Sequence, residues 1–294
     1  MSLILTLVAR NDDRAVRKIS DAAPSGLSAP VETGGAGWSV LERTIDPAGR
    51  SDLVEYLEAA TPAARIDWSI TPAVNRRKRL LISDMDSTII GQECLDELAD
   101  FAGLKAEVSA ITERAMRGEL DFEAALTARV AMLKGLNLQA LEDCYVGRVT
   151  LNPGARALTA TMTANGARCL LVSGGFTYFT SRVALAAGFA ANRANLLLDD
   201  GAALTGDVAR PILGREAKLA ALLEETSALG LTAADALAIG DGANDLAMIR
   251  AAGLGVAYKA KPIVASETEA RIEHTDLTAA LFFQGYKANE IVEG

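Results

Sequence analysis

The sequence is poor in histidine and cysteine, and this scarcity excludes several kinds of active site. His274 is the only histidine among 294 residues, and it lies in a late segment with no obvious partner. A serine-based catalytic triad and a histidine-ligated metal site therefore lack the residues that they require. The three cysteines are far apart in the chain, without the short spacing of structural zinc or a redox dithiol, and we expect them to be reduced core residues: Cys94, Cys144 and Cys169.

Long apolar runs and an excess of positive charge are also missing. No stretch approaches the ~18 to 20 apolar residues of a membrane span, and the first ten residues do not resemble a secretion signal. We therefore expect a cytoplasmic protein without a membrane partner. The formal net charge of -9 argues against a nucleic-acid partner, because binding to a phosphate backbone requires clustered Lys and Arg. The single basic run is predicted to be a solvated linker: Arg76, Arg77, Lys78 and Arg79.

The composition is that of a folded chain, with 50% hydrophobic and 23% charged residues. Its length allows two domains. Residues 1–75 alternate between apolar β-like runs and one helical pattern, which predicts a small α+β domain. The expected elements are strands at Leu3 to Ala9, Trp38 to Ile45 and Ile66 to Ile70, a loop from Pro24 to Gly37, and a helix from Ser51 to Ala60 with Ser51 as its N-cap.

From residue 76 to 294 the pattern changes to short, nearly continuous apolar runs, each followed by a helical stretch. This pattern is typical of a parallel sheet that is buried on both faces. The fold class expected is therefore α/β, with a doubly wound, mostly parallel sheet. Ligands of such sheets bind beyond the carboxyl ends of the strands. The predicted strands are Leu80 to Ser83, Cys169 to Val172, Ala236 to Ile239 and Leu254 to Ala257.

A long helical stretch interrupts the sheet after its first strand. It covers about residues 93–149, beginning at Glu93, and we expect it to form a cap over the site. Further along, Asp199 to Gly201 predicts the turn of a small hairpin, and Arg215 to Leu229 predicts a helix that carries Lys218.

Polar residues follow the predicted strands in a pattern that suits phosphoryl transfer. Asp84 and Asp86 come directly after the first strand, and an ionised aspartate is a nucleophile that needs no histidine. Attack on a phosphate dianion requires positive charge, which Mg²⁺ held by Asp84, Asp86 and Asp241 would supply. Lys218 and the segment from Ser173 to Gly175, including Gly174, are candidates for holding the phosphate oxygens.

Each of these motifs has a plainer explanation when it is taken alone. A lone Asp-x-Asp is usually a solvated turn, and Gly240 to Asp245 could be a turn into a helix that is capped by Asn244 or Asp245. The joint occurrence of the motifs favours a catalytic site.

The segments Asp84-Met85-Asp86-Ser87-Thr88, Ser173, Lys218 and Gly240-Asp241-Gly242-Ala243-Asn244-Asp245 resemble, in order, the four motifs of the haloacid dehalogenase superfamily. The similarity covers about residues 80–285. It implies a Rossmann-like core, Asp84 as nucleophile, and Asp86 as the acid/base that protonates the leaving oxygen and then activates water. Asn244 would help to place substrate or phosphate, and Asp245 would orient Lys218 or a metal-bound water.

Four residues of the predicted cap resemble the substrate-binding residues of the phosphoserine phosphatase branch. Arg129 can bind a carboxylate with two hydrogen bonds, Glu93 can pair with an ammonium, and Met116 and Phe122 can exclude water. Alone, the two charged residues could be helix-surface charges and the two apolar ones core. Together they imply hydrolysis of O-phosphoserine, the last step of serine biosynthesis, with phosphoserine as the small-molecule partner.

Alternatives remain open. The core motifs also fit a phosphatase acting on another small phosphomonoester, or a phosphotransferase. The first ~75 residues resemble the superfamily much less, although some bacterial members carry an ACT-like regulatory domain of similar size. This segment could sense amino acids, which would also suit a regulatory protein without turnover, or it could support a homodimer.

Overall fold

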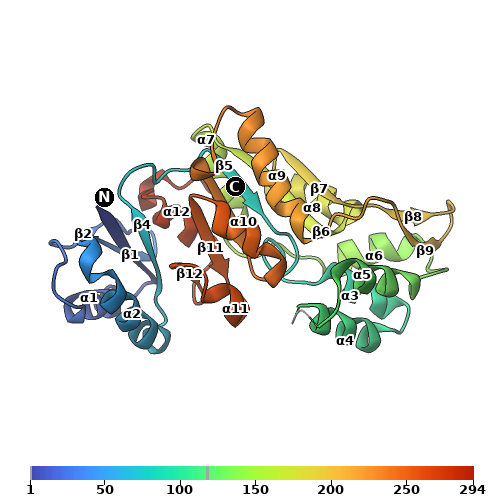
Figure 1. The fold of residues 1–294 in the computed structure, drawn as a ribbon, viewed down its shortest axis with the longest axis horizontal. Coiled ribbons are helices and arrows are strands. Elements are labelled where there is room, and N and C mark those ends of the chain that lie inside the picture. Colours follow the sequence, from blue (N-terminus) through green and yellow to red (C-terminus); the bar gives the residue numbers. More distant parts are fainter. Residues whose placement is uncertain (1, 117–118) are drawn as a thin grey trace.

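The computed structural model describes residues 2–116 and 119–294. Three parts follow one another along the long axis of the molecule (Figure 1): an amino-terminal unit in blue, a central sheet with its helices, and a cap of green helices at the opposite end. The α/β class predicted from the sequence is confirmed.

A mostly parallel set of strands forms the centre of the molecule. The chain places β5 between β10 and β6, and both pairs are parallel. Parallel pairs continue outward from β10 to β11 and β12, and from β6 to β7. The resulting order is β12-β11-β10-β5-β6-β7, with strand bounds β5 Leu80–Ser83, β6 Arg168–Phe176, β7 Ala191–Asn195, β10 Ala236–Gly240, β11 Leu254–Tyr258 and β12 Ala270–Ile272.

Helices cover both faces of these strands. Leu80 and Ile82 of β5 pack in a cluster with Leu222 and Met248, whereas Leu81 joins a second cluster on the opposite face. Alternate residues of one strand are thus buried on opposite sides, as a doubly wound sheet requires. The covering helices are α7 Ala155–Ala164, α8 Thr177–Ala187, α9 Arg215–Ala228, α10 Leu246–Ala251, α11 Pro262–Ala265 and α12 Ala279–Phe283.

The amino-terminal unit continues the same sheet. Its central strand β1 pairs antiparallel with β3 and β4, and β4 pairs antiparallel with β12 of the core, which gives one ten-stranded sheet. The unit also has its own apolar cluster, in which Leu5 and Leu7 pack against Leu53 and Leu57. Its elements are β1 Leu3–Arg10, α1 Asp13–Ala22, β2 Val31–Glu32, β3 Trp38–Ile45, α2 Arg50–Ala64 and β4 Asp67–Pro72.

Several details of this unit differ from the prediction. Helix α1 was not predicted, and strand β2 lies within the segment that was expected to be a loop. Helix α2 begins at Arg50, after a 3₁₀ turn over Pro47–Gly49, so Ser51 lies inside the helix and is not its N-cap. The residue before the helix is Gly49, which has no side chain to form a cap. Strand β4 extends to Pro72, because pairing with β1 continues as far as Leu3 opposite Pro72.

The prediction that the basic run is a solvated linker is wrong for two of its four residues, because Arg77 and Arg79 are exposed whereas Arg76 and Lys78 are not. Lys78 is buried, and its Nζ donates to the carbonyl oxygens of Asn75 and Ala234, at 2.7 and 2.8 Å. Arg76 is half-buried and pairs with Glu42 of β3 at 2.5 Å. The run therefore fastens the amino-terminal unit to the core through hydrogen bonds that a charge count alone does not reveal.

The cap consists of four helices and receives a hairpin from the core. The hairpin of β8 Leu197–Asp199 and β9 Leu204–Val208 has the predicted turn at Asp199 to Gly201, and the backbone N–H of Gly135 in the cap donates to the carbonyl of Leu204 at 2.8 Å. The helices are α3 Cys94–Phe101, α4 Lys105–Met116, α5 Phe122–Ala131 and α6 Gln139–Arg148. Over the described ranges, no helix is both long and apolar enough to cross a membrane.

One buried carboxylate joins the amino-terminal unit to a late segment of the core. Asp67, at the start of β4, is 1% exposed and accepts hydrogen bonds from the backbone N–H groups of Glu273, His274 and Thr275 at 2.7 to 2.9 Å. It also accepts from the Thr275 hydroxyl. Four donors on one buried anion make this contact sensitive to any loss of acceptor capacity.

Replacement of this carboxylate tests its contribution. We expect Asp67→Asn to lower the free energy of unfolding by about 2–4 kcal/mol, because an amide NH₂ would face donors that lose their acceptor. Urea unfolding followed by circular dichroism measures the change. Asp207→Asn, at an exposed position of β9, is the matched control and should stay within about 0.5 kcal/mol of the wild type. Equal stability of both variants would contradict the proposed role of Asp67.

Candidate active site

Asp84 lies where β5 ends, at the carboxyl edge of the sheet. Its backbone N–H donates to the carbonyl of Ile239 in β10 at 3.0 Å, which holds it beside the end of the neighbouring strand. Its Oδ1 accepts from the backbone N–H of Met85 and from Lys218 Nζ, both at 2.8 Å. Among the described residues, no hydrogen bond is made to Oδ2, so this oxygen remains free to react.

Lys218 forms ion pairs with two carboxylates of the site, those of Asp84 and Asp245. It projects from α9, is 2% exposed, and places its Nζ 2.8 Å from Asp84 Oδ1 and 2.6 Å from Asp245 Oδ1. Burial by itself would lower the pKa of Lys218, but Asp245 and Asp84 together raise it above its usual value. The ammonium therefore stays charged.

The loop after β10 brings two more carboxylates to the same edge. A Cβ on Gly240 would lie 2.3 Å from the Asp245 carboxyl carbon, so glycine is required for Asp245 to approach the strand end. The backbone N–H of Gly242 donates to Asp245 Oδ2 at 3.1 Å. Asp241 Oδ1 accepts from the Thr88 hydroxyl at 3.2 Å.

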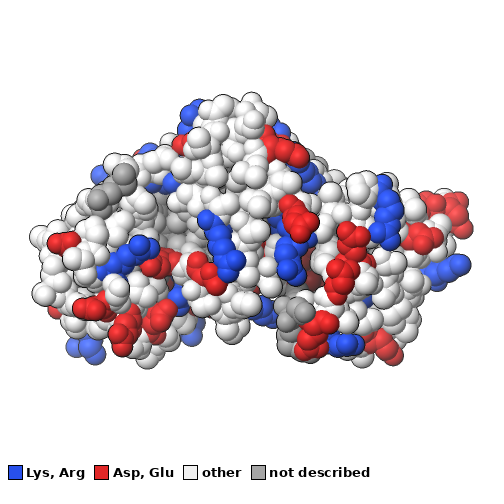
Figure 2. All heavy atoms as spheres, viewed as in Figure 1, with Lys and Arg blue, Asp and Glu red and all other residues white. Residues whose placement is uncertain are grey.

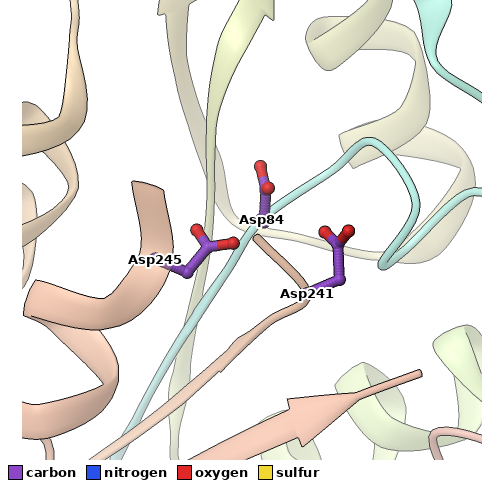
Figure 3. A group of neighbouring side chains, drawn as sticks. All are labelled: Asp84, Asp241 and Asp245. Carbon is purple, nitrogen blue, oxygen red and sulfur yellow. The ribbon is translucent and has the colours of Figure 1, made fainter. Parts of the chain in front are cut away.

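These carboxylates form a group that suits a divalent cation. Oxygen atoms of Asp84, Asp241 and Asp245 all lie within 4.8 Å of one another (Figure 3). Burial and then the charge of Asp84 raise the pKa of Asp241 to about 7 and that of Asp245 to about 8. Three acids beside a single lysine leave excess negative charge, and clustered carboxylate oxygens are the ligands that Mg²⁺ prefers. The residues fit a magnesium site.

Asp86 stays a predicted ligand of this site, and Asp245 adds a carboxylate that was not predicted as a ligand. Asp86 Oδ1 accepts from the backbone N–H of Cys94 at 2.9 Å, and Oδ2 accepts from the Ser173 hydroxyl at 3.1 Å. Both carboxylate oxygens are thus directed toward the cap and β6. Burial and the charge of Asp84 raise the pKa of Asp86 to about 6, which favours a group that exchanges protons near neutral pH.

The segment Ser173 to Gly175 belongs to β6 itself, because the strand runs beyond the predicted end at Val172. The Ser173 hydroxyl accepts from the backbone N–H of Gly175 at 2.8 Å. A Cβ on Gly174 would lie 2.8 Å from the ring of Phe122. The glycines therefore allow the cap to approach the strand closely.

Cap and core enclose one pocket at this edge. Predicted residues of both parts line it: Asp84, Asp86, Glu93, Phe122, Arg129, Ser173, Gly174, Asp241 and Asn244. Lys218 and Asp245 lie next to it, in contact with Asp84 or with each other. Met116 ends α4, and its side chain lies outside the described atoms.

Sequence reasoning missed several residues that line the pocket. Thr112 stands one helical turn before Met116, and Arg215 one turn before Lys218. Residues three or four apart share a helix face, so this spacing was an available signal. The other missed residues are Leu95, Ala115 and Leu126.

Two charged residues stand at the cap side of the pocket. Glu93 Oε1 accepts from the Ser87 hydroxyl at 2.7 Å, and burial together with Asp86 raises the pKa of Glu93 well above its usual value. Arg129 is 8% exposed, and its Nη1 donates to the Thr112 hydroxyl at 2.8 Å. The pocket thus holds an acid and a cation opposite the Asp84 carboxylate.

Comparison with known proteins agrees with this geometry. The haloacid dehalogenase-like hydrolase family matches residues 81–250. A phosphoserine phosphatase of Polaromonas sp. is 46% identical over 208 residues, which are 69% of this chain and 88% of the relative. A haloacid dehalogenase family hydrolase of Salmonella enterica serovar Typhi has a TM-score of 0.86 at 29% identity, over 96% of this chain and 98% of the other.

A further solved structure, a phospho-aspartyl intermediate analogue of phosphoserine phosphatase, has a TM-score of 0.67 at 36% identity and covers 70% of this chain and 99% of the other. The sequence family, the shared fold and the acidic pocket lead to one conclusion: this chain belongs to the haloacid dehalogenase-like hydrolases.

Proposed function

We propose that this chain is a phosphoserine phosphatase, which hydrolyses O-phosphoserine to serine and phosphate through an aspartyl-phosphate on Asp84. The observation that carries the proposal is a single pocket that joins Asp84 at the core to Glu93 and Arg129 in the cap. One end has the groups for phosphoryl transfer, and the other matches an amino-acid head group. Two of the three relatives described above are phosphoserine phosphatases.

In the first step, Asp84 Oδ2 attacks the phosphorus atom while Lys218 and the Met85 N–H hold Oδ1 in place. The bond between phosphorus and the serine oxygen breaks as the new Asp84–phosphorus bond forms. Lys218 offers an N–H to the phosphate oxygens, and the Ser173 hydroxyl would offer its proton to them by turning it away from Asp86. Asn244 lines the same end of the pocket and is proposed to help place the phosphate.

Asp86 moves the proton in both steps. With a pKa of about 6, it can supply a proton to the leaving serine oxygen. In the second step it takes a proton from the water that attacks the phosphorus and releases Asp84. The hydrogen bonds from Cys94 and Ser173 keep its carboxyl group facing the pocket.

Asp84, Asp86 and Asp241 are the residues predicted to hold Mg²⁺, and Asp245 lies in the same group of carboxylates as Asp84 and Asp241. A bound Mg²⁺ would supply the positive charge that offsets repulsion between the carboxylate and the phosphate dianion. Asp245 also keeps Lys218 in position through their 2.6 Å ion pair.

The cap end of the pocket is proposed to recognise the serine head group. Arg129 would bind the carboxylate, and Glu93 beside the ammonium would return to its charged form, because an opposite charge favours ionisation. Phe122 closes the pocket against Gly174 and Gly214. Met116 is proposed to help it exclude water.

On the face drawn in Figure 2, Lys and Arg lie interspersed with Asp and Glu. This face therefore has no basic patch of the kind that binding to a nucleic acid requires. A role in serine biosynthesis, a cytoplasmic location and a homodimer stay predictions.

Phosphate release from a panel of phosphoserine, phosphothreonine and sugar phosphates tests the reaction. We expect strong preference for phosphoserine, dependence on Mg²⁺ with loss of activity in EDTA, and a fall in kcat on the order of 10⁴-fold or more in Asp84→Asn, because the amide is not a nucleophile. Asp207→Asn is the matched control and should keep full activity. Broad activity would contradict the substrate assignment, and an active Asp84→Asn variant would contradict the mechanism.

Replacement of Arg129 tests recognition of the substrate carboxylate. We expect Arg129→Ala to raise KM for phosphoserine by roughly 10- to 100-fold, since a charge-assisted hydrogen-bonded pair contributes about 1.5–3 kcal/mol. Phosphoethanolamine has the same ammonium and phosphate but no carboxylate, so its kcat/KM should change little. Equal losses on both substrates would show that Arg129 does not bind the carboxylate.

A further inference from the structure

Behind the pocket, a buried polar chain connects three cap helices and ends at Arg129. Asp96 on α3 accepts from the Thr112 hydroxyl of α4 at 2.8 Å, and the same hydroxyl accepts from Arg129 Nη1 of α5 at 2.8 Å. The second Asp96 oxygen accepts from the Ser109 hydroxyl at 2.7 Å. Asp96, Thr112 and Arg129 are all buried. Thr112 and Arg129 line the pocket, whereas Asp96 does not.

The hydroxyl of Thr112 has a single proton, and the direction of that proton decides what Arg129 meets. Its distance to Asp96 Oδ1, 2.8 Å, is shorter than its distance to the carbonyl of Val108, 3.1 Å. When the Thr112 hydroxyl directs its proton at Asp96 Oδ1, a lone pair of the same oxygen points at Arg129 Nη1. The Asp96 carboxylate thus orients the acceptor that holds the guanidinium.

Only part of the guanidinium is used inside the cap. Arg129 Nε donates to the carbonyl of Ala125 at 3.2 Å and Nη1 donates to Thr112. A guanidinium has five N–H donors, so three make no hydrogen bond to the residues that the structure describes and can serve a ligand in the pocket. Burial lowers the pKa of Arg129, and the Asp96 carboxylate is the strongest of the charges that oppose this effect.

The chain is also connected to the catalytic edge. Asp96 lies in the first turn of α3, and the first residue of that helix, Cys94, donates its N–H to Asp86. The helix therefore relates the position of Arg129 to the position of the proposed acid/base.

We propose that Asp96, acting through Thr112, is a positioning residue that aims Arg129 at the carboxylate of the substrate, an inference that rests on the proposed function. Asp96 touches no reacting atom. Its effect is to hold the Arg129 guanidinium in place at the wall of the pocket, which lowers the ordering cost of binding.

The test compares Asp96→Asn, Thr112→Val and Thr112→Ser on phosphoserine and phosphoethanolamine. We expect the first two variants to raise KM for phosphoserine about 5- to 10-fold with kcat within about twofold, and to leave phosphoethanolamine unchanged. Thr112→Ser keeps the hydroxyl and should restore KM. Glu97 lies on the same helix as Asp96, and its carboxylate pairs with Lys105 of α4 and Arg148 of α6. The variant Glu97→Gln therefore controls for general damage to the cap.

A double-variant cycle separates positioning from a merely structural role. If Asp96 acts through Arg129, combining Asp96→Asn with Arg129→Ala should raise KM no further than Arg129→Ala alone. Additive losses, or equal losses on phosphoethanolamine, would overturn the proposal. If Asp96→Asn fails to fold, KM values of Thr112→Val and Thr112→Ser for phosphoserine and phosphoethanolamine test the positioning role on their own.

A measurement without turnover keeps this proposal distinguishable from the proposed function. In [¹⁵N]arginine-labelled protein, the Arg129 guanidinium resonance, assigned by its loss in Arg129→Ala, should show slow rotation about Nε–Cζ. Rotation should become faster in Asp96→Asn and Thr112→Val but not in Glu97→Gln. Absence of phosphoserine hydrolysis in the wild type would refute the function alone, and unchanged rotation in both variants would refute the positioning role alone.

Discussion

The active site depends on one buried cation placed between carboxylates. Lys218 contacts Asp84 and Asp245 from a position almost closed to solvent. A buried charge is tolerated only with charged and hydrogen-bonded partners, so the three residues constrain one another. α9 must bring Lys218 beneath the sheet edge, and the loop after β10 must let Asp245 approach. The glycine at position 240 and the free Asp84 Oδ2 are both consequences of this arrangement.

The sheet explains how residues far apart in the sequence meet there. Because β5, β6 and β10 are parallel neighbours, Asp84, Ser173 and Asp241 reach one edge together. The cap then adds Glu93, Arg129 and Phe122 from the opposite side. Core and cap thus divide the chemistry: the strand ends carry the phosphoryl-transfer groups, and the helices carry the groups suited to the rest of the substrate.

Much of this arrangement could be predicted from the sequence, because apolar runs followed by Asp84 and Asp241 are local signals of strands and their ends. The cap was expected because no strand pattern interrupts the helical stretch after Glu93. Strand β7 was missed, since its sequence Ala-Asn-Arg-Ala-Asn at 191–195 has no apolar run. The grouping of Asp245 with Asp84 and Asp241 could not be predicted, because it depends on side-chain direction at a loop. Burial of Lys78 likewise depends on carbonyl groups that the chain brings from residues 75 and 234.

The junction of β4 with β12 also bears on aggregation. An unpaired strand edge offers a row of hydrogen-bonding groups to other chains, and proteins avoid leaving such an edge open. β12 has only three residues, and β4 occupies its outer side. The exposed end of the sheet is thereby moved to β2, a strand of two residues beyond β3. The amino-terminal unit thus protects the β12 side of the catalytic core from edge-to-edge association, while β7 forms the edge at the other end of the sheet.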